Sequence, residues 1–284
     1  MEAAALGLFM ISAGLFGTLL EHPDSPVRQA IECDGLRRAL MGLAMGVTAI
    51  VIIYSPWGRR SGAHMNPAVT LTFLRLGKVK AWDAAFYMVS QFLGGLAGVG
   101  IVAALLGGRF TAPPVSFVAT TPGPRGTLVA FAAEVMIAAV MMGMILITMN
   151  SPRWSRRTGL LAGLLVALFI TFEAPYSGMS LNPARTTASA LPSGLWTAWW
   201  VYFLAPPLGM LLAVEMGRWL RGRVEPHCAK LNHHTRQRCI FCGFGMTASC
   251  DPSAPRLVVP LALSEDASGP ASIASGTWAG TQAA

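Results

Sequence analysis

The sequence predicts an all-α membrane protein in which six transmembrane helices and two re-entrant half-helices form an inverted repeat. Three observations lead to this fold class. Hydrophobic residues make up 54% of the 284 residues and charged residues only 12%, whereas an average soluble domain is about one quarter charged. Six apolar runs approach the ~20 residues that a membrane-spanning helix needs. One polar motif also occurs twice, each time after an apolar run.

The six apolar runs set the expected order of elements. Transmembrane helices are expected at about residues 3–20, 39–54, 82–106, 127–149, 159–172 and 195–220. The connection 21–38 contains Pro-bearing turns and is expected outside the membrane. The connection 107–126 is rich in Gly, Pro and Thr, and we expect it to join the two halves of the molecule on that outer side.

The repeated motif reads SGAHMNPA at residues 61–68 and SGMSLNPA at residues 177–184. In each copy an Asn that can cap a helix precedes a Pro suited to the first helical position, so a helix is predicted to start there. Because this start lies at membrane depth, its backbone must face a cavity or buried protein. The predicted half-helices cover about residues 67–76 and 183–190. The predicted pore residues of the two motifs are Asn66, Pro67, Ala68, Asn182, Pro183 and Ala184.

Three spans and one half-helix occur in each half of the chain, over about residues 1–106 and 127–220. An odd number of crossings inverts the second half relative to the first, and Pro-interrupted segments at matching places indicate a transport path. We therefore expect a channel domain at residues 1–222 and a tail at residues 223–284. The Pro, Ser, Ala and Gly content after about residue 251 predicts a flexible end.

The net charge of +8 reflects membrane topology and no nucleic-acid partner is expected. Most of the basic residues fall in connections on one side of the six predicted spans, so the positive-inside rule predicts an integral cell (inner) membrane protein with both termini in the cytoplasm. Arg37 and Arg38 would lie on the other side. No basic n-region precedes the first apolar run, so we expect no cleavable signal peptide. The basic residues on the predicted inner side are Arg59, Arg60, Arg75, Lys78, Lys80, Arg153, Arg156, Arg157, Arg218, Arg221, Arg223, Lys230, Arg236 and Arg238.

The twin motifs make the chain resemble the aquaporin (major intrinsic protein) family over roughly its first 220 residues. If the half-helices enter from opposite faces, their positive N-terminal ends meet near the midplane, favouring a neutral acceptor such as water and repelling cations. The resemblance implies a passive channel for water and small uncharged solutes in a lipid membrane, assembled as a homotetramer and requiring no cofactor. No nucleophile–base pair or cofactor fingerprint occurs in the spans, so an enzyme is not expected.

The resemblance also implies a constriction formed by Gly46, Ile170, Met179 and Arg185. Water-selective members carry an aromatic residue and a His at the first two places, so this constriction is expected to be wide and to admit glycerol, urea or undissociated metalloid acids. Phe172 filling the gap beside Gly46 is an alternative.

Other positions in the second half indicate a water channel. The residue directly after Arg185 is Thr186, and Ala190 follows four places later, where glycerol-conducting members carry Asp and a basic residue. The aromatic pair Tyr202 and Phe203 also matches the water-channel pattern. These positions and the wide constriction favour different solutes, so the preferred solute stays open.

Three titratable residues lie in or near the predicted spans. Glu2 and Glu134 stand at matching places in the two halves, where the resemblance implies that they accept hydrogen bonds from the loops before the half-helices. The alternative is a proton relay in an ion-coupled inverted-repeat transporter. His64 either faces the cytoplasmic vestibule or is a packed core residue.

The tail contains four of the five cysteines, Cys33 being the other. A reducing cytoplasm argues against disulfides, while thiolate and imidazole groups at this spacing are typical of zinc ligands. The alternatives are an iron–sulfur site, a thiol sensor, metalloid capture and unstructured reduced cysteines. A metal- or redox-responsive tail would make the protein a gated channel. The candidate ligands are Cys228, His233, His234, Cys239, Cys242 and Cys250.

Overall fold

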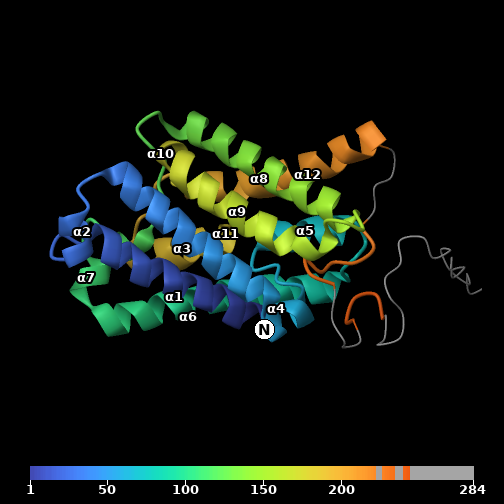
Figure 1. The fold of residues 1–284 in the computed structure, drawn as a ribbon, viewed down its shortest axis with the longest axis horizontal. Helices are drawn as coiled ribbons and strands as arrows, with labels where there is room; N and C mark the ends of the chain where they lie inside the picture. The colour runs from blue at the N-terminus through green and yellow to red at the C-terminus, as the bar shows by residue number, and fades with distance from the viewer. Residues whose placement is uncertain (222–225, 234–238, 244–284) are drawn as a thin grey trace, which may run out of the picture. The chain divides into compact units, whose positions relative to one another are not determined.

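The computed structural model describes residues 1–221, 226–233 and 239–243, and the structural statements below concern these residues. Among them no strand occurs, and six helices are long and apolar enough to cross a membrane, which confirms the predicted all-α membrane class. Figure 1 shows these long helices packed side by side as a bundle. They are α1 (Glu2–Glu21), α3 (Asp34–Tyr54), α6 (Ala81–Leu106), α8 (Thr127–Met149), α9 (Thr158–Phe172) and α12 (Trp199–Arg221), and α9 reaches the spanning length together with the helical turn at Ser155–Arg157 that precedes it.

Two shorter helices begin inside the repeated motif. Both α5 (Pro67–Arg75) and α11 (Pro183–Ser193) start at the motif Pro, as predicted from the Asn-Pro pair. Each of them packs against both α6 and α12, so each half-helix touches both halves of the bundle. The remaining short segments are α2 (Pro26–Ala30), α4 (Pro56–Ser61), α7 (Gly108–Thr111), η1 (Ser116–Val118), η2 (Ser155–Arg157) and α10 (Ala174–Ser177).

Two predicted helix starts are wrong by several residues. Helix α3 begins at Asp34 instead of residue 39, because its charged first turn is held by the polar network described below. Helix α12 begins at Trp199 instead of residue 195. Gly194 ends α11 with a left-handed φ of 69° and Ala198 has a φ of 49°, so the chain turns between these two residues.

The inverted repeat is visible in how the helices approach one another. Helix α1 packs against α6, and α8 packs against α12 in the same way. A Cβ atom on Gly94 of α6 would lie 2.1 Å from the carbonyl oxygen of Ala3, and one on Gly209 of α12 would lie 2.2 Å from that of Val135. The residues of these two contacts stand at corresponding places in the two halves, and small residues permit such close approach in membranes.

The two halves meet along α3 and α9. A Cβ atom added to Gly46 would lie 2.6 Å from the carbonyl oxygen of Gly163, and one added to Gly163 would lie 2.6 Å from the carbonyl oxygen of Gly46. This reciprocal contact is what a local two-fold relation between the halves requires. It leaves no room for a side chain at either glycine.

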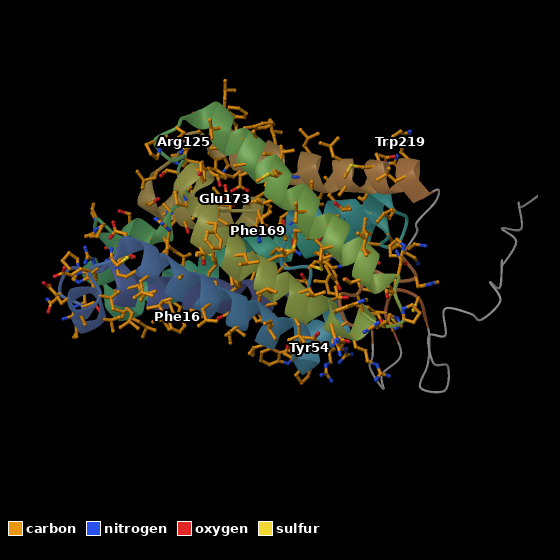
Figure 2. All side chains as sticks on the ribbon, turned by 45° about the horizontal axis from the view of Figure 1, so that its top comes forward. Phe16, Tyr54, Arg125, Phe169, Glu173 and Trp219 are labelled. Atoms are coloured by element: carbon orange, nitrogen blue, oxygen red, sulfur yellow. The ribbon has the colours of Figure 1, made fainter. Side chains whose placement is uncertain are left out.

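Apolar side chains cover the outside of the bundle. Phe16 on α1 is 39% exposed and Trp219 on α12 is 83% exposed, and Figure 2 shows both on the outer surface. Side chains of this kind are favoured where the surrounding medium is hydrocarbon, and they would be costly in water.

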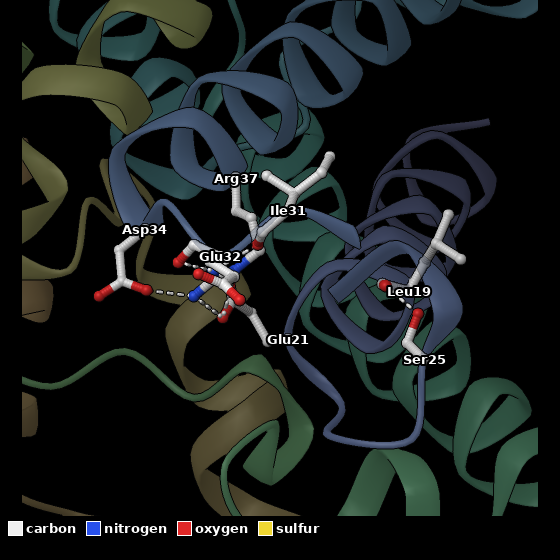
Figure 3. A network of polar contacts seen from close by, with 7 residues as sticks. All are labelled: Leu19, Glu21, Ser25, Ile31, Glu32, Asp34 and Arg37. Carbon is white, nitrogen blue, oxygen red and sulfur yellow. Dashed lines mark hydrogen bonds and ion pairs between the residues drawn. The ribbon is translucent and has the colours of Figure 1, made fainter. Parts of the chain in front are cut away.

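A polar network holds the connection between α1 and α3 in place, at the end of the bundle opposite to the N-terminus. The Arg37 guanidinium donates to the carbonyl oxygens of Ile31 and Glu32, both at 2.8 Å, and also pairs with the carboxylates of Glu21 and Asp34 (Figure 3). The Arg37 side chain is only 3% exposed, so this pairing offsets the cost of burying its charge. It explains why a basic residue is tolerated at this end.

Candidate functional site

A cavity of about 330 Å³ extends along the bundle between the two halves. Its lining includes Glu21 and Arg38 from the end that carries the α1–α3 connection. It also includes His64 and Leu231 at the opposite end, where α3, α8 and α12 finish with their basic connections. We call this opposite end the basic end. A cavity that extends between the two ends of a membrane-spanning bundle has the shape that a solute path needs.

The two motif asparagines meet inside this cavity and cap the half-helices. Asn66 Oδ1 accepts from the backbone N–H of Ala68 at 2.9 Å, and Asn182 Oδ1 accepts from that of Ala184 at 3.0 Å. Asn66 Nδ2 donates to the carbonyl oxygen of Leu181 at 2.6 Å, and Asn182 Nδ2 donates to that of Met65 at 2.7 Å. Both asparagines line the cavity, and each amide nitrogen carries a second N–H that these bonds do not use.

Glu2 holds the loop that leads to α5. Its Oε1 accepts from the Ser61 hydroxyl at 2.6 Å and from the His64 backbone N–H at 3.2 Å. Its Oε2 accepts from the Met65 N–H at 2.6 Å and from the Gln91 side-chain amide at 2.9 Å. These contacts agree with the structural role expected for Glu2.

Glu134 holds the loop that leads to α11 in the same manner. Its Oε1 accepts from the Ser177 hydroxyl at 2.9 Å and from the Ser180 N–H at 2.6 Å, and its Oε2 accepts from the Leu181 N–H at 2.8 Å. Neither Glu134 nor Glu2 belongs to the lining of the cavity. Both carboxylates therefore face protein backbone, which argues against their use as a proton relay.

The loops held by these carboxylates have unusual backbone angles. Ala63 and Met65 have φ values of 54° and 50°, and the matching Met179 and Leu181 have φ values of 50° and 58°. Positive φ costs non-glycine residues roughly 1–3 kcal/mol each and persists only where surrounding contacts fix it. The hydrogen bonds to Glu2 and Glu134 supply such contacts.

Three of the four predicted constriction residues line the cavity, and they are Ile170, Met179 and Arg185. One terminal nitrogen of the Arg185 guanidinium, Nη1, is buried and has no hydrogen-bond partner among the described residues. A buried donor without a partner is costly, because its lost hydration is not replaced. A solute in the cavity would supply the missing acceptor.

The fourth prediction, Gly46, is wrong for the pore lining. Gly46 packs on Gly163 of α9 and is absent from the lining, whereas the adjacent Met45 lines the cavity. The alternative that Phe172 fills a gap beside Gly46 also fails, because the Phe172 side chain is 69% exposed. The spacing from the motif thus missed the lining position by one residue, because Met45 and not Gly46 lies on the face of α3 that lines the cavity.

The face of α3 that does line the cavity was not predicted. It consists of residues spaced three or four apart, as expected for one side of a helix. That spacing, with Met at two of the places, is the signal that could have found it. The lining residues of α3 are Arg38, Met41, Met45, Ala49 and Ile53.

Two tyrosines support the motif loops at matching places. The Tyr202 hydroxyl donates to the carbonyl oxygen of Ser177 at 2.6 Å, and the Tyr87 hydroxyl donates to that of Ser61 at 2.7 Å. Tyr202 was interpreted above as part of a water-channel pattern, and Tyr87 was not predicted as a supporting residue. Tyr202 is absent from the cavity lining, so its described contact is structural.

Thr186 and Ala190 lie on the buried side of α11. The Thr186 hydroxyl pairs with that of Ser180, in the loop before α11. Neither residue belongs to the cavity lining, so their described contacts are with other parts of the protein.

His64 takes part in both of its predicted settings. It lines the cavity, and its ring stacks on Phe73 with centroids 5.0 Å apart. Its Nδ1 is 3.0 Å from the Thr70 hydroxyl, and its Nε2 is 2.7 Å from the carbonyl oxygen of Ala229 in the tail. The tail therefore reaches the basic end of the cavity.

Four of the predicted metal ligands come together in the tail. One ligand atom from each of Cys228, His233, Cys239 and Cys242 lies within 4.8 Å of all the others. The hydrogen bond between Cys228 and Cys239 lowers the pKa of the Cys239 thiol and raises that of Cys228, whose burial raises it further. His234 and Cys250 lie outside the described residues.

Comparison with known proteins extends these observations. Residues 4–216 match the family model described as Major intrinsic protein. Aquaporin NIP2-3 of Zea mays is 36% identical over 203 residues, which cover 69% of this chain and 64% of that protein. Aquaporin A of Dictyostelium discoideum is 33% identical over 196 residues, which cover 67% of this chain and 69% of that protein. The chain thus spans slightly less than two thirds of the maize protein.

A solved structure supports the fold. The X-ray structure of the aquaglyceroporin from Plasmodium falciparum superposes with a TM-score of 0.60 at 19% sequence identity, covering 77% of this chain and 93% of that one. At this identity the likeness concerns the arrangement of helices alone. The region matched by the family model includes both motifs, four of the long helices in full, and all but the first residues of α1 and the last residues of α12.

Proposed function

Because the chain belongs to the major intrinsic protein family, whose members are channels and not enzymes, we propose that it conducts water and small uncharged solutes passively across a membrane. Two facing half-helix N-termini, each capped by an Asn, favour a neutral hydrogen-bond acceptor at the middle of the cavity. Cations are repelled there by the same partial charges. Flux then depends only on the gradient of the solute itself.

The observation that carries this proposal is the buried Arg185 nitrogen without a partner inside the cavity. It offers a hydrogen bond to any passing acceptor and its positive charge opposes the entry of cations. The other two predicted constriction residues of the lining, Ile170 and Met179, are apolar, so a solute in this cavity meets a strong donor together with apolar side chains. Such a lining accommodates the carbon side of a polyol while Arg185 binds a hydroxyl.

We infer that glycerol, urea or undissociated metalloid acids pass in addition to water. The cavity lining contributed by α3 includes Met41 and Met45, and a methionine side chain is flexible enough to make room for a larger solute. His64 at the basic end is the one histidine of the described lining. The described constriction residues therefore include no imidazole that would narrow the path around Arg185.

The proposed setting is a homotetramer in the cell (inner) membrane, one pore per subunit, with the basic end in the cytoplasm. The basic connections at that end support this orientation under the positive-inside rule. Apolar side chains on the outer faces of several long helices, such as Leu43 (58% exposed) and Leu105 (69% exposed), are available for lipid and for neighbouring subunits. Cross-linking in native vesicles would test the tetramer.

Light scattering from proteoliposomes tests the function. An osmotic gradient of an impermeant solute should shrink protein-containing vesicles faster than empty ones, and a glycerol gradient should be followed by fast re-swelling. Fast shrinkage without fast re-swelling would limit the function to water. Flux no faster than in empty vesicles, under conditions that leave the pore open, would contradict the proposal.

The rival function, an ion-coupled transporter, uses Glu2 or Glu134 as its coupling site. Four hydrogen bonds to Glu2 and three to Glu134 engage both carboxylates with the protein. A proton or sodium gradient should therefore leave solute flux unchanged. Uphill solute accumulation driven by either gradient would favour the transporter.

A further inference from the structure

The strongest feature outside the pore is the four-residue cluster in the tail. Cys228 Sγ lies 3.4 Å from Cys239 Sγ, and His233 Nε2 lies 3.1 Å from Cys242 Sγ. In a tetrahedral zinc site with Zn–S bonds of about 2.3 Å, neighbouring sulfur atoms are about 3.8 Å apart. The distance between the Cys228 and Cys239 sulfur atoms is therefore within a few tenths of an ångström of this value, and all four ligand atoms lie within 4.8 Å of one another.

The donor set points to zinc more than to its rivals. Three thiols and one imidazole form a Cys₃His set, which is common in structural zinc sites, whereas iron–sulfur clusters are generally held by four cysteines. Cys228 and Cys239 are both 4% exposed, which suits a structural site without an open position for water. The Cys239-x-x-Cys242 spacing is also typical of zinc ligands.

The same tail segment is seated on the basic end of the cavity. The Leu231 backbone N–H donates to the carbonyl oxygen of Gly62 at 3.2 Å, and Leu231 itself lines the cavity. The Ala229 carbonyl is 2.7 Å from His64 Nε2, and the Phe241 ring stacks on the His64 ring with centroids 5.9 Å apart. The tail therefore contacts two residues of the first motif at the mouth of the proposed pore.

The contacting segment lies between the metal ligands in the chain. Residues 229–232 stand between Cys228 and His233, and they are buried, with exposures from 0% at Ala229 to 6% at Asn232. Phe241 lies between Cys239 and Cys242. If all four ligands bind one ion, they fix both contacting parts, residues 229–232 and Phe241, which together we call the plug. The position of the plug and the occupancy of the metal site must therefore be coupled.

We propose that Cys228, His233, Cys239 and Cys242 bind a zinc ion, and that the bound ion holds residues 229–232 and Phe241 over the mouth of the pore and closes it. The inference rests on the proposed channel function. A ligand that binds only the ordered arrangement shifts the population toward it. Zinc therefore stabilises the seated tail, and its removal releases the tail and opens the mouth.

Metal binding is tested with Co²⁺ and Zn²⁺ on the full-length protein. Tetrahedral thiolate coordination should give Co²⁺ its visible absorption bands at one ion per chain, and Zn²⁺ should displace it. Cys239→Ser should weaken binding at least tenfold, whereas Cys33→Ser, at an exposed cysteine far away in the sequence, should leave it unchanged. Absence of the bands, or equal binding by Cys239→Ser, would overturn the site.

Docking is tested by amide hydrogen exchange, which needs no flux. In the zinc-loaded protein the peptide containing Leu231 should be protected, and a chelator should remove that protection. Phe241→Ala should lose the protection and still bind zinc, because Phe241 supplies a contact with His64 and no ligand atom. Protection that is the same with and without zinc would overturn the metal-held plug.

Closure is tested by proteoliposome flux with the basic end facing the chelator. Chelation should raise wild-type flux about fivefold or more, and Cys239→Ser should be fast and insensitive to zinc. Equal flux with and without zinc, beside fast flux overall, would overturn the gate while leaving the channel. If Cys239→Ser also shows flux at the empty-vesicle level, the channel function is refuted, and closure of the pore with it. The cobalt experiment would still test metal binding, and the exchange experiment would still test docking of the tail.

Discussion

The two loops that lead into α5 and α11 differ in sequence and share one scaffold. Each is held by a carboxylate from the first helix of its half, and each receives a tyrosine hydroxyl at its Ser carbonyl. Each also begins with a glycine at positive φ, 98° at Gly62 and 82° at Gly178. The two halves therefore keep the same hydrogen bonds to the loop backbone although other loop residues differ, because backbone polar groups buried within a membrane protein need partners from the protein.

The two halves differ in one residue that lines the cavity after each motif Asn and in whether the tail contacts the loop. Three residues after the motif Asn, the second half carries Arg185 and the first half carries Val69, and both line the cavity. The first loop in turn is covered by the tail through Gly62 and His64. The features shared by the two halves thus form the cavity. The differences between the halves place a charged donor, Arg185, in the second half and the tail contacts at the first loop.

The carboxylates allow the largest test of this comparison. Glu2→Ala would leave four donors without their acceptor, and we expect a loss of about 4 kcal/mol in the free energy of unfolding. Glu134→Ala would leave three donors without their acceptor and should cost about 3 kcal/mol. Denaturation in detergent with tryptophan fluorescence measures both.

The control for these two variants is Glu215→Ala. Glu215 is half exposed and pairs with Arg75 at 3.1 Å, so its neutralisation should cost less than about 1 kcal/mol. Equal losses for Glu2 and Glu134 variants would mean that the Gln91 contact carries no weight. Losses at the level of the control would remove both carboxylates from the scaffold.

The contact between the halves gives the next effect. Gly46→Ala places a Cβ atom 2.6 Å from the Gly163 carbonyl oxygen, and such overpacking should cost about 2–3 kcal/mol. Gly100→Ala on α6 is the matched control, because nothing lies within 4 Å of the added atom. If the Gly46→Ala protein were as stable as the wild type and its glycerol flux were altered, Gly46 would line the pore after all.

Much of the fold follows from local sequence. Apolar runs and the Asn-Pro pairs located the helices and the half-helix starts, because burial in lipid and helix capping act within a few residues. The pairing of Glu134 with its loop could be expected from its matching place to Glu2. By contrast, Gly46 was misplaced by one residue, because the spacing from Asn66 does not show which face of α3 lies toward the cavity.

The tail contacts could not be predicted for a different reason. Nothing in the sequence of Ala229 or Leu231 indicates Gly62 or His64 as a partner, since such contacts join segments more than 150 residues apart. The Cys and His spacing did indicate a ligand set, and the structure brings together four of its six members. His234 and Cys250 stay predictions, as does the role of the motif residues in conduction.

Exchanging the residues that distinguish the loops should alter selection. Arg185→Val gives the second half the residue of the first, and it removes the charge and the unpartnered donor from the cavity. We expect larger or cationic solutes such as methylammonium to enter about tenfold faster, a barrier change of about 1.4 kcal/mol. Vesicle swelling measures this, with exposed Arg153→Val as the control. Unchanged selectivity would exclude Arg185 from the filter.

The tyrosines give the smallest and most discriminating test. Tyr202 is fully buried, so Tyr202→Phe leaves the Ser177 carbonyl without its donor and should cost about 1–1.5 kcal/mol in unfolding free energy.

Tyr87 is half-buried beside the tail, with its ring centroid 6.0 Å from that of Phe241, and water can replace its hydroxyl once the tail leaves. Tyr87→Phe should therefore cost about 0.5 kcal/mol, and Phe241→Ala should reduce that cost further, while the Tyr202→Phe cost stays the same. Tyr54→Phe, whose hydroxyl bonds the Arg156 carbonyl at an exposed site, serves as the near-neutral control. Equal costs at Tyr87 and Tyr202, independent of Phe241, would mean that the tail does not distinguish the two ends of the molecule.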